Sequence, residues 1–404
     1  MSTCCVLGLG YIGLPTAAVL AHSGHRVIGV DVNPQVVANV NEGQIHIVEP
    51  DLDQAVAAAV TSGALTSQLT PAPADVFLIA VPTPFRSGAD GIPQPNIDYV
   101  LAAARSIATV LRPGNLVLLE STSPVGTTEK VAEEISKISG FNSEEIHIAY
   151  CPERVLPGRI LHELISNDRV IGGLTPAAAL AGRAFYASFS EGELLTTTAR
   201  TAELVKLTEN SFRDVNIAFA NELSLVCDHL EINTRELIRL ANHHPRVNVL
   251  QPGCGVGGHC IAVDPWFIAA AAPHCTPLIQ TARRVNDGKS RWVIDQVQAR
   301  AAALEDQLSR TARIGCLGLA FKPDVDDLRE SPALHITTEL LVSGLEVLAC
   351  EPNLADHATF KLHTLERVLA DADLLVFLVA HSPFKGLNLK GRSVFDLCGV
   401  TEQL

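Results

Sequence analysis

The chain is poor in positive charge. Its 404 residues include 30 lysines and arginines against 44 aspartates and glutamates, which leaves a formal net charge of −14. This balance argues against nucleic acid or an anionic membrane as a partner, because both are bound through basic surfaces. No segment resembles a DNA-binding helix-turn-helix. Since 47% of the residues are hydrophobic and only 18% are charged, we expect two or three domains with large cores rather than disorder.

Long apolar runs and paired cysteines are also missing. No apolar run has membrane-spanning length and no basic secretory segment precedes the first strand-like run, so we expect a cytoplasmic protein that does not bind membranes. The ten cysteines include no Cys-x-x-Cys pair. Cys4, Cys5, Cys316 and Cys350 lie in apolar strand-like runs, where packing is the expected role. We therefore expect no disulfides.

Strand-like and helix-like runs alternate through the first half of the chain. The pattern predicts an α/β fold with a parallel, doubly wound sheet. From about residue 200 it changes to long helical periodicity, over Thr201 to Leu230 and Arg235 to Ala241, and a second strand-and-helix region begins near Arg313. The predicted strands of the first region are Val76 to Val81, Leu116 to Glu120, Ile146 to Tyr150 and Arg169 to Gly172, and its predicted helices include Leu52 to Val60 and Ile97 to Leu111.

A glycine-rich turn near the N-terminus predicts a dinucleotide site. Gly8, Gly10 and Gly13 follow a short apolar strand and precede an apolar helix from Leu14 to Leu20, and Asp31 ends the next predicted strand. This spacing places a carboxylate on the adenosine ribose, where it would bind the 2′-hydroxyl and repel a 2′-phosphate. The prediction is NAD rather than NADP, although a turn in another doubly wound domain would share the glycines.

The C-terminal region repeats the first region in a degenerate form. Cys316 to Ala320 is similar to Val6 to Gly10, and Ala320 and Pro323 stand where we align Gly10 and Gly13. Because the glycines that let a pyrophosphate approach are lost, we expect this copy to handle a nucleotide but not to bind a dinucleotide. A cleft between two such lobes is a usual place for a substrate.

A second glycine-rich stretch, from Gly253 to Asp264, carries a candidate nucleophile. Cys260 lies between His259 and Asp264, and a thiol in such surroundings can be activated as a thiolate. The glycines would let a bulky polar substrate lie against the backbone. A tight turn with a buried thiol has the same pattern. A zinc site from Cys254, His259, Cys260 and Asp264 matches no structural zinc spacing, and we expect no metal.

The long predicted helix carries a polar stripe. Lys206 and Asn210 are four residues apart and hence share a face, and Asp214 and Asn221 continue near it. A lysine beside an apolar face is more often a surface residue whose stem packs on that face. The stripe therefore indicates a site only together with the cysteine stretch.

Seven ordered motifs across nearly the whole chain resemble the UDP-glucose/GDP-mannose dehydrogenase family. Within the family, Glu49 to Leu52, Cys151 to Gly158 and Gly258 to Phe267 are similar to the branch that acts on UDP-N-acetyl-D-mannosamine. Pro157 and Ala262 depart from the UDP-glucose branch, which weakens the transfer of its substrate contacts. The seven motifs are Gly8 to Pro15, Val81 to Pro84, Glu120 to Thr128, Cys151 to Arg154, Lys206 to Asn210, Gly257 to Cys260 and Phe321 to Pro332.

The resemblance implies an architecture and an activity. It implies an NAD-binding Rossmann domain over 1–195, a central helical dimerisation domain with catalytic residues over 196–300, and a Rossmann-like UDP-sugar domain over 301–404. The implied reaction is the NAD-dependent oxidation of a UDP-sugar at C6, from alcohol to carboxylate, through a cysteine thiohemiacetal and thioester. UDP-N-acetylglucosamine and UDP-glucose remain alternative substrates, and a homodimer is expected.

Site residues follow from the same resemblance and from the chemistry each side chain offers. The catalytic candidates are Cys260, Lys206, Asn210, Asp264, Glu153 and Thr122. The cofactor candidates are Gly8, Gly10, Tyr11, Ile12, Gly13, Asp31, Pro82, Thr83, Thr122 and Arg329. The substrate candidates are Glu153, Arg154, Lys206, Asn210, Arg246, Gly257 and Lys322. Two other classes stay open, namely a one-step β-hydroxyacid dehydrogenase that does not need Cys260 and a non-catalytic NAD-sensing protein.

Overall fold

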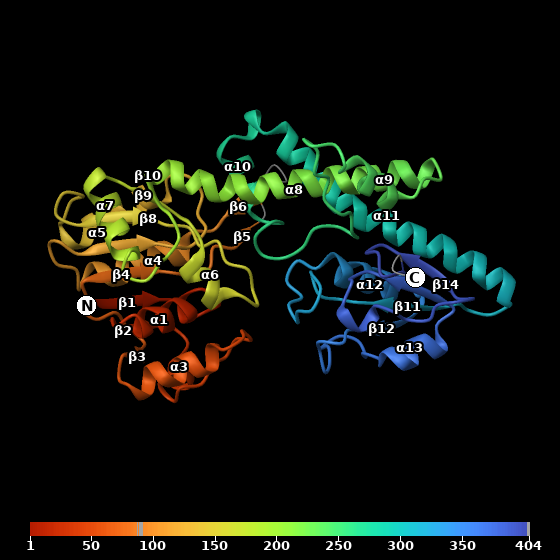
Figure 1. Cartoon of the computed structure of the whole chain (residues 1–404), viewed down its shortest axis with the longest axis horizontal. Coiled ribbons are helices and arrows are strands. Elements are labelled where there is room, and N and C mark those ends of the chain that lie inside the picture. The colour runs from red at the N-terminus through yellow and green to blue at the C-terminus, as the bar shows by residue number, and fades with distance from the viewer. Residues whose placement is uncertain (87, 89–91, 402–404) are drawn as a thin grey trace. The chain divides into compact units, whose positions relative to one another are not determined.

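The computed structural model describes residues 1–86, 88 and 92–401, which fall into two units (Figure 1). Unit 1 comprises Met1–Thr208 and Trp266–Ala272, and unit 2 comprises Glu209–Pro265 and Pro273–Leu404. The division crosses two helices, α8 (Ala199–His229) and α10 (Asp264–Ala271). Residues 402–404, which end the predicted third domain, lie outside the described residues.

Unit 1 is built on an eight-stranded sheet with strand order β10-β9-β8-β7-β4-β1-β2-β3. The four strands predicted between residues 76 and 172 are confirmed to within two residues as β4, β7, β8 and β9. A separate two-stranded antiparallel pair is formed by β5 (Phe85–Arg86) and β6 (Gln94–Pro95). The strands of the main sheet are β1 (Thr3–Leu7), β2 (Arg26–Val30), β3 (Leu65–Gln68), β4 (Val76–Ile79), β7 (Leu116–Leu119), β8 (His147–Tyr150), β9 (Arg169–Gly173) and β10 (Leu194–Thr198).

Both faces of this sheet are buried under helices. Along β1, Cys4 and Val6 belong to one core, and Cys5 and Leu7 belong to the other, because successive side chains of a strand point to opposite faces. The first core packs against α1 (Gly13–His22), α2 (Pro34–Asn41), α3 (Leu52–Thr61), α6 (Ile160–Ser166) and α7 (Pro176–Tyr186). The second packs against α4 (Asp98–Ala108), α5 (Thr127–Ser139) and the start of α8.

One strand pair departs from the predicted parallel sheet. β9 runs antiparallel to β8, with Tyr150 opposite Gly172, whereas the other pairs of the sheet are parallel. Residues 151–159 are irregular and the connecting helix α6 has only seven residues, so the chain re-enters the sheet at the edge where β8 left it. Consequently Arg169, the first residue of β9, lies at the carboxyl edge of β7 and β8.

Long helices dominate the first part of unit 2. The helices predicted over 201–230 and 235–241 are confirmed as α8 and α9 (Thr234–Ala241). After the short helices α10 and η1 (Pro273–Cys275), α11 extends over Pro277–Leu308. None of the described helices is long and apolar enough to span a membrane.

A four-stranded parallel sheet with order β12-β11-β13-β14 forms the rest of unit 2. This order repeats β2-β1-β4-β7 of unit 1, and Gly318 donates to Cys350 O (2.9 Å) as Gly8 donates to Val30 O (2.8 Å). The sequence repeat is therefore a structural repeat. Its elements are β11 (Arg313–Leu317), α12 (Pro332–Val342), β12 (Glu346–Cys350), α13 (Leu365–Asp371), β13 (Leu374–Phe377), η2 (Ser382–Phe384) and β14 (Ser393–Asp396).

One detail of the predicted repeat is wrong. In unit 1 the helix begins at Gly13, directly after the turn, whereas in unit 2 it begins only at Pro332. Residues 321–331 form an inserted loop between the turn and the helix, and Pro323 lies within that loop. Pro323 is therefore not the counterpart of Gly13.

Candidate functional site

The N-terminal glycine turn has the geometry of a dinucleotide site. Gly8 has φ +88°, and a Cβ there would meet Ala80 O at 2.6 Å, while a Cβ on Gly13 would meet Gly8 O at 1.8 Å. These two glycines therefore allow the tight turn and the close packing of α1. A Cβ on Gly10 would meet nothing within 4 Å, so this position faces open space, where a pyrophosphate needs to approach. The three positions fit the roles that the fingerprint assigns to them.

Asp31 follows β2 beside this turn. Its Oδ2 accepts a hydrogen bond from Leu9 N (2.9 Å) and its Oδ1 accepts one from Asn33 N (2.9 Å). Two backbone donors hold the carboxylate, and each oxygen has a further lone pair for a ribose hydroxyl. This arrangement fits NAD, whose ribose offers hydroxyl donors there.

The loops after β4 and β7 are tied together at the carboxyl edge of the sheet. Ser121 Oγ donates to Val81 O (2.7 Å), which connects the loop of Pro82 and Thr83 to that of Thr122. The second loop leads into α5, whose first N–H groups, Gly126 N (2.6 Å) and Thr128 N (2.8 Å), donate to the buried carboxylate of Glu203 on α8. Glu203 was not among the predicted site residues, although it precedes Lys206 by three residues and therefore lies near it on the same helix face.

Glu153 belongs to a buried cluster whose other members, Arg169, Tyr186 and Glu120, were not among the predicted site residues. Its Oε1 accepts from Arg154 N (2.6 Å), and its Oε2 lies 3.6 Å from Nη1 of the buried Arg169. The Arg169 guanidinium also lies over the Tyr186 ring, 4.7 Å from its centroid. Tyr186 Oη donates to Glu120 (2.7 Å), and burial, followed by the charge of Glu153, raises the pKa of Glu120 to about 7.

The cysteine stretch in unit 2 separates its two thiols. Cys254 is buried, its Sγ donates to Leu378 O (3.6 Å), and burial raises its pKa to about 12. Cys260 is only half-buried. Its carbonyl accepts from Asp264 N (2.8 Å), and the buried carboxylate of Asp264 accepts from Asn210 Nδ2 (2.5 Å). The buried-thiol interpretation thus fits Cys254, whereas Cys260 is half-buried and is hydrogen-bonded through its backbone carbonyl to Asp264.

The polar stripe of α8 divides into two parts. Lys206 is only 9% exposed, which does not fit a surface lysine that reaches solvent. Asp214 instead accepts from Arg283 Nη1 (2.7 Å), and Asn221 accepts from Gly253 N (2.9 Å). These two residues fix α8 to α11 and to the start of the cysteine stretch.

The glycines of the cysteine stretch make room for the protein's own loop 321–331. A Cβ on Gly257 would meet Glu330 O at 2.5 Å, one on Gly258 would meet the Phe321 ring at 2.9 Å, and Gly258 N donates to Arg329 O (3.1 Å). We expected this room for the substrate, and the structure supplies a different reason for it. Among the other candidates, Arg329 is half exposed and pairs with Asp327 (2.5 Å), Lys322 Nζ lies 5.8 Å from the Phe321 ring centroid, and Arg246 is exposed.

Within residues 1–86, 88 and 92–401, no three His, Cys, Asp or Glu side chains are arranged to hold a metal ion. Unit 1 carries a dinucleotide turn, and unit 2 carries the half-buried Cys260, whose carbonyl is hydrogen-bonded to the backbone of the buried Asp264. This combination defines a dinucleotide-dependent dehydrogenase.

Comparisons with known proteins agree with this class. Family models for the NAD-binding, central and UDP-binding domains of the UDP-glucose/GDP-mannose dehydrogenase family match residues 2–190, 200–288 and 315–403. The chain therefore belongs to this family and is an NAD-dependent nucleotide-sugar dehydrogenase.

Three relatives illustrate the similarity. The UDP-N-acetyl-D-mannosamine dehydrogenase of Escherichia coli K12 is 55% identical, over 99% of both chains. The NDP-N-acetyl-D-galactosaminuronic acid dehydrogenase of Ralstonia nicotianae is 51% identical, over 98% of this chain and 96% of its own. A solved UDP-D-ManNAc dehydrogenase from Pyrococcus horikoshii has a TM-score of 0.91 at 37% identity, over 100% of this chain and 96% of its own.

Proposed function

We propose that the chain oxidises UDP-N-acetyl-D-mannosamine at C6 to the uronate, in two oxidations that pass through Cys260. The 55% identity to an enzyme named for this substrate supports the choice of sugar. The observation that supports covalent catalysis is the half-buried Cys260, whose carbonyl accepts from the backbone of Asp264, the hydrogen-bond partner of Asn210. UDP-N-acetylglucosamine and UDP-glucose are the alternative substrates.

The first oxidation converts the C6 alcohol to an aldehyde. NAD⁺, when bound, accepts one hydride from C6 in each of the two oxidations. A base takes the hydroxyl proton, either directly or through a water molecule held near Lys206, Asn210 and Asp264. Asp264 is held for this role by its hydrogen bond from Asn210 Nδ2 (2.5 Å).

The second oxidation needs a nucleophile. The Cys260 thiolate adds to the aldehyde carbon, and the resulting thiohemiacetal retains the hydrogen that C6 must lose. Its oxidation leaves a thioester. Water then cleaves the thioester to the carboxylate and restores the thiol, while Lys206 and Asn210 stabilise the oxyanion. Asp264, together with Thr122 and Glu153, orients and deprotonates this water.

We assign binding roles to the remaining candidates and propose three domains. The Gly8–Gly13 turn with Tyr11 and Ile12, together with Asp31, Pro82, Thr83, Thr122 and Arg329, binds the cofactor. Glu153, Arg154, Arg246, Gly257 and Lys322 contact the UDP-sugar, since guanidinium and ammonium groups suit phosphate and sugar oxygens. The NAD-binding, central and UDP-sugar domains extend over 1–195, 196–300 and 301–404.

A homodimer is part of the proposal. Phe212, Phe219 and Val226 on α8 follow one another at seven-residue intervals and are 67%, 52% and 46% exposed. Seven residues make nearly two helical turns, so the three side chains share one face. A second copy of the chain would cover this apolar stripe. We also place the enzyme in the cytoplasm.

The deciding experiment measures NADH formed per sugar nucleotide consumed, with a panel of UDP- and GDP-sugars. We expect two NADH per UDP-N-acetyl-D-mannosamine and a 6-carboxylate product. Cys260→Ser should stall after one hydride or accumulate a slowly hydrolysed ester, because serine is a far weaker nucleophile near neutral pH. Cys254→Ser is the matched control and should keep two NADH per sugar.

The other outcomes identify the competing functions. One NADH per sugar in the wild type, or unchanged turnover in Cys260→Ser, would favour a one-step dehydrogenase. NAD⁺ binding without turnover on any sugar nucleotide would favour an NAD-sensing protein.

A further inference from the structure

Glu351 occupies in unit 2 the position that Asp31 occupies in unit 1. Each residue follows the second strand of its repeat, and Glu351 Oε2 accepts from Leu319 N (2.7 Å) as Asp31 Oδ2 accepts from Leu9 N (2.9 Å). The two carboxylates differ in their surroundings. Asp31 is partly exposed, whereas Glu351 is buried and also accepts from Ala320 N (3.0 Å). The carboxylate at this position is thus partly exposed in unit 1, as Asp31, and internal in unit 2, as Glu351.

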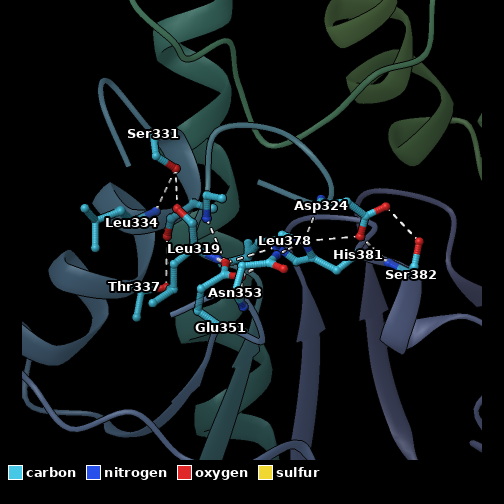
Figure 2. Close-up of polar contacts among 12 residues, drawn as sticks. Leu319, Asp324, Ser331, Leu334, Thr337, Glu351, Asn353, Leu378, His381 and Ser382 are labelled. Atoms are coloured by element: carbon cyan, nitrogen blue, oxygen red, sulfur yellow. Dashed lines mark hydrogen bonds and ion pairs between the residues drawn. The ribbon is translucent and has the colours of Figure 1, made fainter. Parts of the chain in front are cut away.

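The partner of Glu351 is His381, a fully buried side chain that follows β13 (Figure 2). His381 Nε2 lies 3.0 Å from Glu351 Oε2, and His381 Nδ1 accepts the backbone N–H of Asp324 (2.9 Å). A backbone N–H can only donate, so Nδ1 is an acceptor and the ring proton lies on Nε2, which donates to Glu351. Glu351 thereby selects the tautomer that can hold Asp324.

Asp324 lies in the inserted loop 321–331 and is held through its backbone N–H and through its carboxylate. It has φ +59°, an uncommon conformation for a residue other than glycine. Its Oδ1 accepts from Ser382 N and its Oδ2 from Ser382 Oγ, both at 2.7 Å (Figure 2). At the far end of the loop, Ser331 Oγ donates to Leu319 O (2.6 Å). The loop is therefore fixed near both ends to the turn and to the β13 loop.

The same loop supports the cysteine stretch. Gly258 N donates to Arg329 O (3.1 Å), and Glu330 O and the Phe321 ring occupy the space that side chains on Gly257 and Gly258 would need. Gly258 is two residues before Cys260. The loop also carries Lys322 and Arg329, for which we propose substrate and cofactor contacts.

We propose that His381 and Glu351 are positioning residues for the reaction, which hold loop 321–331 and through it the backbone before Cys260. The inference rests on the proposed function for the roles of Cys260, Lys322 and Arg329. His381 makes its decisive contact through Nδ1, and Glu351 acts by fixing the proton on Nε2.

Two substitutions of His381 distinguish the roles of its two ring nitrogens. In His381→Asn the amide oxygen can take the place of Nδ1 and still accept from Asp324 N, whereas in His381→Gln the amide reaches toward Glu351 and that acceptor is lost. We expect His381→Gln to raise KM for the UDP-sugar at least tenfold and to lower kcat, with a much smaller change in His381→Asn. Glu351→Leu offers no acceptor to Nε2 and should resemble His381→Gln.

His25→Gln is the matched control, because His25 is also buried and its Nε2 bonds one side chain, Ser188 Oγ (2.9 Å), in unit 1. It should leave kcat and KM unchanged. The melting temperature of every variant is measured beside the kinetics. If His381→Asn and His381→Gln lose activity equally, in proportion to their loss of melting temperature, His381 is only a structural residue and the proposal is overturned.

A second readout does not depend on turnover. The rate at which iodoacetamide alkylates Cys260, followed by peptide mass spectrometry, reports the geometry of the stretch directly. We expect a severalfold change in His381→Gln and Glu351→Leu, and a near wild-type rate in His381→Asn and His25→Gln. If the wild type oxidises no UDP-sugar, the proposed function fails, and the alkylation rates still support or overturn the positioning role.

Discussion

Glu120 should make unit 1 less stable as the pH rises through neutrality. Its carboxyl is buried, and burial together with the charge of Glu153 raises its pKa from 4.5 to about 7. Between pH 4.5 and about pH 7, the folded protein therefore keeps a proton on Glu120 that the unfolded chain has lost. Stability from this group is fully present below pH 4.5 and decreases until the pH passes 7.

The magnitude follows from the shift. Each pKa unit corresponds to about 1.4 kcal/mol, so the rise from 4.5 to about 7 gives a decrease of about 3 kcal/mol across this pH window. Glu120→Gln cannot ionise, and its amide oxygen can still accept from Tyr186 Oη, which donates at 2.7 Å in the wild type. The substitution should therefore remove most of this pH dependence.

Urea denaturation from pH 5 to pH 8 tests the prediction. The chain has two tryptophans, Trp266 in unit 1 and Trp292 in unit 2, so Trp292→Phe leaves a fluorescence probe in unit 1. The control in this background is Glu129→Gln. The hydrogen bond from Arg200 lowers the pKa of Glu129 from 4.5, so the contribution of Glu129 to stability is lost only at pH values below 4.5. Glu129→Gln should therefore leave the pH dependence between pH 5 and pH 8 unchanged. A difference between wild type and Glu120→Gln that stays constant with pH would refute the reasoning.

The remaining predictions concern cofactor, catalysis and assembly. The wild type should strongly prefer NAD⁺, and Asp31→Ala should relax that preference; equal wild-type efficiency with NADP⁺ would contradict the assignment of Asp31. Calorimetry should find one NAD⁺ site per chain, since Glu351 already occupies the N–H groups of the second turn; two equivalent sites would contradict this account of the repeat. Lys206→Ala should lower turnover on the order of a hundredfold with nearly unchanged NAD⁺ affinity; normal turnover would remove Lys206 from the oxyanion site. Phe219→Asp should shift the sedimentation coefficient from dimer to monomer, because a charge cannot be buried in an apolar stripe without a partner; an unchanged dimer would place the interface elsewhere.

The sequence alone determined the features that depend on local spacing. A strand, a turn with Gly8, Gly10 and Gly13, a helix and a second strand ending in Asp31 are consecutive in the chain. Each step is governed by local sterics and periodicity, so their relation was readable without the tertiary structure. The long helices and the strand repeat were predictable for the same reason.

Only the tertiary structure decided which distant side chains meet. Arg169 and Glu153 pair because β9 returns antiparallel, and no local pattern around either residue specifies that direction. His381 meets Glu351 across 30 residues, and no local pattern around either residue predicts that pairing. Cys254 and Cys260 share one glycine-rich stretch, yet one thiol is buried and the other half-buried. Burial and long-range pairing depend on how the whole chain packs. The local motifs therefore predicted the family, whereas the packing determined which side chains of the site are buried and which of them meet.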